Sequence, residues 1–343
     1  MRIAVDVMGG DFAPVEIIKG ALQAVEEYGL AIDLVGDEEQ VYAELDKYDA
    51  GDLVRVVHAP EVIEMRDHPA VAVRRKKNSS IVKATQLVKD GAAQAVVSAG
   101  STGASMTSAL LSLGRIKGID RPAIAIVLPG EDGFTLLLDI GANVDCKPHN
   151  LLQFGMMGSL YARQILGVAN PKVGLLSNGE EETKGDEVTL AAFPLLANAG
   201  INFIGNVEGR DIYRSVVDVL VCDGFVGNIL LKAGEGLAEF LFKIMKEEVA
   251  KSLLSLNAGG TMTGVALEGI QKRIEYAEYG GAPLLGVNGV SVVCHGRSTA
   301  KAIKNAIRVA KEAVDNNLVS AIRESIRIAE KKEVGCTDAQ GSA

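Results

Sequence analysis

Glycine and polar residues that could bind an anion cluster at several points of this 343-residue sequence. In the cluster SAGSTG, a glycine-rich segment stands between a β-branched run and a helical pattern, with Thr102 as the expected N-cap. The free N–H groups and the positive dipole of a helix N-terminus bind phosphate-like anions. The spacing matches neither a dinucleotide fingerprint nor a Walker A loop, so it predicts an anion site without a nucleotide.

Other clusters supply groups that could assist a reaction. A flexible lysine in SNGEEETKG could reach an anion as a point charge, although three glutamates are equally typical of a solvated loop. The segment CDGFVGN could position a hydroxyl or a leaving group, and the histidine of VVCHGR could donate a proton, although a packed core histidine is an equal alternative. The candidate catalytic residues are Lys184, Asn178, Asp223, Asn228 and His295.

The segment LLDIGANVD brings two carboxylates close together in the chain. Asp139 and Asp145 could hold Mg²⁺ or share a proton, or Asp139 and Asp223 could simply bind backbone N–H groups of their own turns. Neither the His nor the Cys spacing is typical of a metal site, so no metal site is predicted, and assistance by Mg²⁺ stays open. The candidate substrate-binding residues are Gly9, Gly10, Asp11, Ser98, Gly100, Ser101, Thr102, Gly103, Asp139, Asn143, Asp145 and Gly185.

Alternating strand and helix patterns must position these residues. The predicted strands are 2–7, 32–35, 53–57, 94–97, 123–128, 134–138, 172–176, 201–204, 218–222 and 290–294, and the predicted helices are one from residue 14 and 38–47, 80–89, 102–113, 148–166, 186–197 and 298–315. This rhythm predicts one α/β domain over residues 1–328, a doubly wound, mostly parallel sheet with helices on both faces. Because ligands bind beyond the carboxyl ends of such strands, we expect the polar clusters to line one common crevice.

One stretch breaks the rhythm. Residues 225–256 read as a single long helix, and a glycine turn and a returning helix over 265–276 complete a hairpin of about 225–278. We expect the hairpin to project from the sheet and to place Leu253, Leu254 and Leu256 at an apolar tip, which would pack against a second copy or dip among lipid headgroups. Residues 329–343 are polar and small, and we expect a disordered tail.

Composition limits the partners. With 35 Lys+Arg against 44 Asp+Glu and 4% aromatic residues, the chain has no global attraction to nucleic acid and no stacking platform for single strands. It shows neither a signal-peptide core nor an apolar run of about 18 residues, and we expect a cytoplasmic protein. The strongest basic run is Arg74, Arg75, Lys76 and Lys77, which is either a solvated helix end or a docking site for an acidic partner.

Taken together and in order, the motifs resemble a known family. VDVMGGDFAP, SAGSTGA, LLDIGANVD, LLSNGEEETKG, NFIGNVEGRDI, DVLVCDGFVGN and GAPLLGVNGVSVVCHGRS resemble the bacterial phosphate acyltransferases of phospholipid synthesis. The resemblance implies transfer of a long-chain fatty acyl group from acyl-[acyl carrier protein] to inorganic phosphate. The acyl phosphate would pass to a membrane glycerol-3-phosphate acyltransferase. A phosphotransacetylase- and isopropylmalate-dehydrogenase-like fold, a homodimer and peripheral attachment to the inner face of the membrane are implied as well.

The residue chemistry is compatible with this reaction. Phosphate is itself an oxygen nucleophile and a thiol leaves readily, so neither a Ser or Cys nucleophile nor a cofactor is required. We expect phosphate at Gly100–Gly103 and Lys184, oxyanion stabilisation by Asn178 or Asn228, and protonation of the thiol by Asp223 or His295. The alternatives are a phosphotransacetylase acting on acyl-CoA, an NAD-dependent dehydrogenase of the isopropylmalate type, which would need an adenine–ribose site and an Asp-x-x-x-Asp cluster, and a non-catalytic membrane scaffold.

Overall fold

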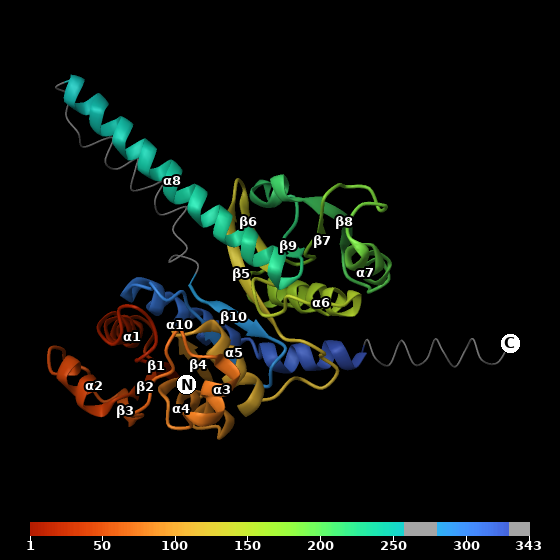
Figure 1. The fold of residues 1–343 in the computed structure, drawn as a ribbon. Coiled ribbons are helices and arrows are strands. Elements are labelled where there is room, and N and C mark those ends of the chain that lie inside the picture. Colours follow the sequence, from red (N-terminus) through yellow and green to blue (C-terminus); the bar gives the residue numbers. More distant parts are fainter. Residues whose placement is uncertain (257–279, 329–343) are drawn as a thin grey trace, which may run out of the picture.

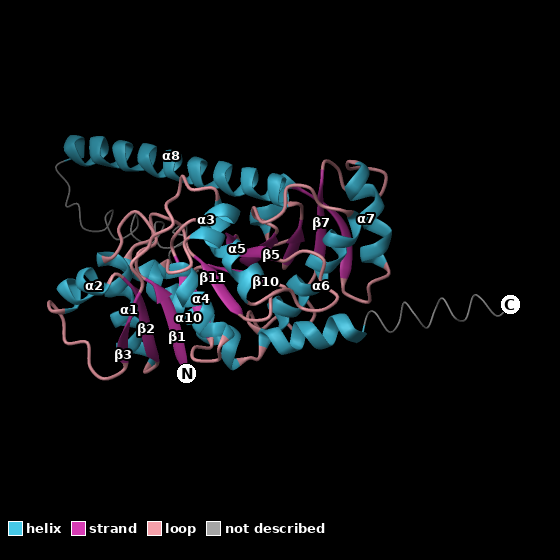
Figure 2. Ribbon diagram, turned by 60° about the horizontal axis from the view of Figure 1, so that its bottom comes forward, coloured by secondary structure: helices cyan, strands magenta, loops and turns pink. Residues whose placement is uncertain are grey.

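The computed structural model describes residues 1–256 and 280–328, which form one large twisted sheet with helices on both faces (Figure 1, Figure 2). The sheet has 11 strands in the order β3-β2-β1-β4-β11-β10-β5-β6-β9-β7-β8. The strands are β1 (Arg2–Asp6), β2 (Ala31–Gly36), β3 (Val54–His58), β4 (Ala95–Ser98), β5 (Ala123–Gly130), β6 (Gly133–Leu138), β7 (Val173–Ser177), β8 (Phe203–Glu208), β9 (Val219–Val221), β10 (Ala282–Leu285) and β11 (Val290–Val293).

The helices fall between the strands, as the sequence pattern predicts. They are α1 (Val15–Tyr28), α2 (Glu38–Leu45), α3 (Pro69–Arg75), α4 (Ser80–Lys89), α5 (Thr102–Ser112), α6 (Pro148–Gln164), α7 (Glu187–Ala197), α8 (Gly224–Leu256), α10 (Ala300–Asp315) and the 3₁₀ helix η1 (Gly209–Arg214). Residues 318–328 are helical as well. The predicted mostly parallel α/β fold is therefore confirmed.

Alternation along β1 shows why both faces are covered. Ile3 and Val5 join a core cluster with Ile17 and Ile18 of α1, whereas Ala4, between them, joins a separate cluster under α4. Successive side chains of a strand point to opposite faces, and all three strand residues are fully buried. Apolar runs without polar alternation are the sequence signature of such strands.

The polar clusters do not all leave the sheet at one edge, because the strand direction reverses within it, yet residues that follow β4, β6, β9 and β11 line one cleft. β1, β2, β3, β4 and β11 run parallel to one another, and β6, β9, β7 and β8 also run parallel to one another. Between these halves, β10 is antiparallel to both β11 and β5, and β5 is antiparallel to β6. Three successive reversals leave the two parallel halves pointing in opposite directions.

Helix α8 is the long element predicted from residue 225. Its 33 residues start beside β6 and extend beyond the body of the molecule (Figure 1). The returning helix predicted over 265–276 and the tail predicted over 329–343 lie outside the described residues, as do the side chains of the predicted tip residues Leu253, Leu254 and Leu256.

Candidate active site

A cleft of about 310 Å³ lies between α5 and α8, over the strands at which the sheet reverses. Its floor comes from three neighbouring strands. Val293 of β11 pairs with Ala282 of β10, and Leu284 of β10 pairs with Ile124 of β5. Ile124 and Ile126 line the cleft together because alternate strand residues share a face. The floor is therefore apolar, with the small Ala282 in its middle.

One end of the cleft, here called the α5 end, carries polar groups. The N–H of Cys294 donates to the carbonyl of Ser98 (2.8 Å), so the segments that follow β4 and β11 leave the sheet at the same edge. They contribute Thr102 and His295 to the cleft, and α8 contributes Lys232. Lys232 Nζ pairs with Glu235 Oε2 at 2.7 Å. This end therefore combines a helix N-terminus, an imidazole and a cation.

Local hydrogen bonds define two of these groups. The Ser101 hydroxyl accepts the Ala104 N–H at 3.4 Å, so Ser101 is the N-cap of α5, and the prediction that Thr102 would cap it is wrong. Thr102 is instead the first helical residue and lines the cleft. His295 Nδ1 accepts the Arg297 N–H at 3.2 Å, which assigns the proton of the neutral ring to Nε2.

A buried carboxylate holds the glycine-rich loops of the α5 end together. Asp6, 2% exposed, accepts the Ser98 hydroxyl at 2.7 Å, and Ser98 Oγ accepts the Gly100 N–H at 3.1 Å. A Cβ on Gly9 would lie 2.6 Å from the Gly100 nitrogen, so only glycine permits this close approach. Burial raises the pKa of Asp6, against hydrogen bonds from Ser80 and Ser98 that lower it.

A third loop completes this end. The Asp11 N–H donates to the carbonyl of Gly296 at 2.7 Å, and a Cβ on Gly10 would lie 3.1 Å from the same oxygen. The predicted residues Gly9, Gly10, Asp11, Ser98, Gly100, Ser101, Thr102, Gly103 and His295 thus belong to one assembly of loops.

The opposite end, here called the β6 end, begins at a second buried carboxylate. Asp139 is fully buried and accepts backbone N–H groups from Ile124, Gly141, Ala142 and Asn143 at 2.7–3.2 Å. The Asn143 side-chain amide donates to it as well, at 2.9 Å. Burial raises the pKa of Asp139, against these hydrogen bonds, which lower it. All these donors come from the protein, so Asp139 organises its own loop.

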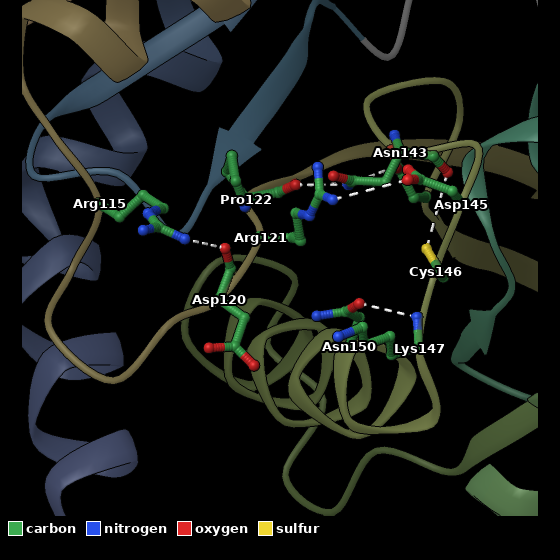
Figure 3. Close-up of polar contacts among 10 residues, drawn as sticks. Arg115, Asp120, Arg121, Pro122, Asn143, Asp145, Cys146, Lys147 and Asn150 are labelled. Carbon is green, nitrogen blue, oxygen red and sulfur yellow. Dashed lines mark hydrogen bonds and ion pairs between the residues drawn. The ribbon is translucent and has the colours of Figure 1, made fainter.

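Asp145 does not bind the Asp139 loop but pairs with Arg121 (Figure 3). Arg121 extends toward Asp145 at 3.7 Å, and the Asp145 side chain is 75% exposed. Asn143 is turned inward, donating to the carbonyl of Pro122 at 2.7 Å. Asp139 and Asp145 therefore point in different directions, and the geometry does not support the paired Mg²⁺ site considered above.

Among the described residues, one group of carboxylates is close enough to share an ion: Glu180, Glu208 and Asp211. Arg210 occupies its centre, with Nη2 2.6 Å from Glu208 and 3.7 Å from Glu180. The Arg210 guanidinium thus offsets one of the three negative charges of this group.

The start of α8 packs tightly against the Asp139 loop. The Gly224 N–H donates to the carbonyl of Asn143 at 2.6 Å, and a Cβ on Gly227 would lie 1.9 Å from the carbonyl oxygen of Asp139. Asp223 accepts the N–H groups of Phe225 and Val226 at 2.7 and 2.9 Å, which is the geometry of a helix cap. Asn228, one turn further on, lines the cleft.

The two remaining candidate catalytic residues are not brought to the cleft. Asn178 and Lys184 lie exposed on the loop between β7 and α7 and are absent from the cleft lining. This loop, which includes Gly185, is closed by the Lys184 N–H donating to Glu181 O (3.0 Å) and by Asn206 Nδ2 donating to the same carbonyl (2.8 Å). The loop follows β7, which runs parallel to β6 and β9 but lies beyond both of them in the strand order, so the loop leaves the same edge of the sheet without reaching the cleft.

The basic run divides into a structural residue and three exposed ones. Lys76 Nζ binds the carbonyl of Val62 (2.8 Å) and Asp67 (2.6 Å), and this hydrogen bond lowers the pKa of Asp67. Arg74, Arg75 and Lys77 are exposed at the end of α3. The start of α3 touches the α5 end of the cleft, because a Cβ on Gly103 would lie 2.6 Å from Pro69 Cγ.

Sequence reasoning identified Thr102, Asn228 and His295 of the cleft lining and missed the rest, including two residues that matter for the reaction, Lys232 and Ala282. Lys232 interrupts the apolar run ILLK of α8, and such a charge within an apolar face was the available signal. Ala282 lies in the short strand β10, which was not predicted at all.

The same fold is found in a phosphotransacetylase of known structure. A phosphotransacetylase from Streptococcus pyogenes superposes with a TM-score of 0.63 over 92% of this chain and 94% of its own, at 17% sequence identity. At that identity the likeness establishes the fold, which is the phosphotransacetylase-like fold expected above.

Sequence comparisons establish the family. The model of a family described as fatty acid synthesis protein matches residues 1–321. A phosphate acyltransferase of Pelotomaculum thermopropionicum is 70% identical over 98% of both chains. Another, from Desulforamulus reducens, is 58% identical over 95% of this chain and 97% of its own. The chain belongs to the phosphate acyltransferase family of enzymes, as the motifs indicate.

Proposed function

We propose that this enzyme transfers a long-chain fatty acyl group from acyl-[acyl carrier protein] to inorganic phosphate, giving an acyl phosphate for the first acylation of glycerol 3-phosphate. The observation that carries the proposal is the cleft itself, whose apolar floor meets hydrogen-bond donors and a cation at one end. An apolar floor suits an acyl chain, and donors suit an anion. Family membership supports the same reaction.

The cleft favours direct attack by phosphate. Its one cysteine, Cys294, is 6% exposed, and burial raises the pKa of its thiol to about 12, so the reactive thiolate is scarce at neutral pH. A phosphate oxygen would form the new C–O bond at the thioester carbonyl, and the C–S bond would then break. No covalent enzyme intermediate and no cofactor is needed.

The residues of the cleft fit distinct roles in this reaction. Phosphate would bind at the α5 end, beside the N–H groups that open the helix at Thr102. The Asn228 amide would donate to the oxyanion of the tetrahedral intermediate. The departing thiolate would receive a proton from a donor at the α5 end, with His295 Nε2–H as our candidate.

The carrier protein would dock next to the α5 end. Val71, 50% exposed, shares a face of α3 with Arg74 and Arg75, which follow it by three and four residues. Carrier proteins are acidic in general, so a basic surface with an exposed apolar residue complements them in a chain of net charge -9. The helix leads from this surface to the cleft.

The exposed length of α8 suits a second copy of the chain. Leu237, Phe240, Leu241 and Ile244 are 41–57% exposed at the 3–4 spacing of one helix face. We propose a homodimer through this stripe, and contact of the Leu253, Leu254 and Leu256 region with the inner membrane surface. Within residues 1–256 and 280–328, no helix is both long and apolar enough to span a bilayer.

The reaction is tested by incubating purified protein with palmitoyl-[acyl carrier protein] and phosphate and trapping the mixed anhydride with hydroxylamine. We expect phosphate-dependent palmitoyl hydroxamate. Parallel reactions with palmitoyl-CoA and acetyl-CoA separate the carrier-linked donor from the phosphotransacetylase alternative, and titration with NAD tests the dehydrogenase alternative. Hydroxamate formed only from the CoA thioesters, or from none of the donors, would reject the proposed donor or the proposed reaction, respectively.

A further inference from the structure

Lys232 faces the reacting region from α8. It lines the same cleft as Thr102 and His295 and stands one helical turn beyond Asn228. Residues four apart lie on the same face of a helix and are about 6 Å apart along its axis. A group bound by Lys232 is therefore adjacent to a group bound by Asn228.

The charged residues of the cleft lining point to Lys232. Among the described residues that line the cleft, Lys232 is the only lysine or arginine and Glu235 is the only carboxylate. Inorganic phosphate at neutral pH carries between one and two negative charges, which a cleft in an acidic protein must balance. Lys184, the lysine favoured by the sequence, is absent from this lining.

The pairing of Lys232 leaves it available to a ligand. Its partner Glu235 lies three residues along the same helix at 2.7 Å, and the Lys232 side chain is 49% exposed. A half-exposed pair of this kind is weak, because water and salt screen it. A phosphate oxygen that enters the cleft can replace the carboxylate at Nζ.

We propose that Lys232 is the cation that binds inorganic phosphate in this cleft. The inference rests on the proposed function and specifies its phosphate site. Lys232 Nζ holds one phosphate oxygen while another attacks the acyl carbonyl beside Asn228. The acyl chain then extends from this point over Ile126, Ala282 and Ile124 toward the β6 end.

The test compares Lys232→Met with Lys232→Arg and Lys184→Met. We expect Lys232→Met to raise the KM for phosphate about tenfold or more, as loss of a charged hydrogen bond predicts, and to change the KM for acyl carrier less than twofold. Lys232→Arg should recover most of the phosphate affinity. Lys89→Met is the matched control, since Lys89 is an exposed helical lysine outside the cleft lining, and it should behave as wild type.

An unchanged KM for phosphate in Lys232→Met would overturn the inference, whether or not Lys184→Met raises that KM. A rise in the KM for the acyl carrier alone would assign Lys232 to the phosphate of the carrier's prosthetic group and would also reject it. Calorimetric titration of wild type and Lys232→Met with inorganic phosphate, without acyl donor, separates the two proposals. Phosphate binding lost in the variant supports Lys232 even where no acyl phosphate is formed, whereas equal binding rejects it.

Discussion

The two ends of the cleft lie on halves of the sheet that run in opposite directions, and their chemistry differs accordingly. The α5 end presents Thr102, Lys232 and His295 to the cavity. The β6 end presents Val144 and Phe225, which are 68% and 58% exposed, and keeps its carboxylate inside the loop. An elongated substrate with a polar head and an apolar chain can satisfy both ends in one orientation only.

The comparison also shows what a polar residue at the end of a strand does. Asp6 and Asp139 are both buried, and both bind the groups that shape their loops. Neither lines the cleft. The groups available to a ligand are those that do not hold a loop together, such as the amine of Lys232.

The largest effect is expected at the β6 end. Asp139→Ala removes the acceptor of four backbone N–H groups and leaves several of them buried without a partner, which should lower the free energy of unfolding by roughly 3 kcal/mol or more. Urea unfolding followed by circular dichroism measures the loss. Asp145→Ala is the matched control in the same loop, and because its ion pair is exposed it should change stability by less than about 1 kcal/mol. Equal losses would contradict a structural role specific to Asp139.

The docking surface beside the α5 end should have the next largest effect. Replacing Arg74, Arg75 and Lys77 together by glutamate should raise the KM for the acyl carrier about tenfold or more at low salt, because steering by charge becomes repulsion. The increase should shrink in high salt as the charges are screened. The KM for phosphate should stay within twofold.

A matched substitution tests whether carrier docking is confined to Arg74, Arg75 and Lys77. Lys83→Glu reverses a cation on the neighbouring helix α4, where its amine binds the carbonyl of His58. A carrier KM that rises as much in Lys83→Glu as in the triple variant would assign the effect to net charge and reject a localised surface.

Much of the fold could be predicted because burial of both faces of the sheet produces recognisable hydrophobic patterns in short stretches of sequence. Apolar strand runs and amphipathic helices depend on near neighbours in the chain, and ten of the 11 strands were found in this way, although β8 begins later than predicted. Strand β10 was missed, since four residues that follow glycines and contain a proline carry no clear period. The direction of each strand depends on pairing between distant segments, which one sequence does not display.

The site was predicted in part for the same reason. The glycine-rich segments indicated close backbone approach, and Gly9 and Gly100 do meet. Asn178 and Lys184 follow β7, which shares its carboxyl edge with β6 and β9 but is separated from the cleft floor by both strands, and one sequence does not display the order of strands in a sheet. Lys232 lies on a helix that crosses between the two edges, so no rule about strand ends could identify it.

The apolar middle of the cleft should select for chain length. Ala282→Phe fills the floor between Val293 and the isoleucines of β5, and it should lower kcat/KM for a palmitoyl carrier about tenfold relative to an octanoyl carrier. Ala282→Val, which adds less volume and strains the fold less, should give a smaller change in the same direction. Uniform losses for both donors would show that the acyl chain does not lie over this floor.

The smallest effect is expected from the buried carboxyl of the α5 end, and its dependence on pH distinguishes it from an ordinary loss of packing. Burial raises the pKa of Asp6 in the folded protein above the ordinary value of about 3.9 that it regains on unfolding. Between those two pKa values the folded state binds more protons than the unfolded state, so the free energy of unfolding falls as pH rises through this window. The neutral amide of Asp6→Asn has no such titration.

The difference in unfolding free energy, wild type minus Asp6→Asn, should therefore decrease as pH rises from about 4 through the raised pKa of Asp6 and then become constant. Urea unfolding of both proteins across this range measures it, and Asp139, whose pKa is also raised, cancels because both proteins contain it. Ser98→Ala, which removes the hydroxyl that Asp6 accepts, weakens a hydrogen bond that lowers this pKa and should extend the window to higher pH. A difference that does not vary with pH would mean that Asp6 holds the Ser98–Gly100 loop without the cost of a buried charge.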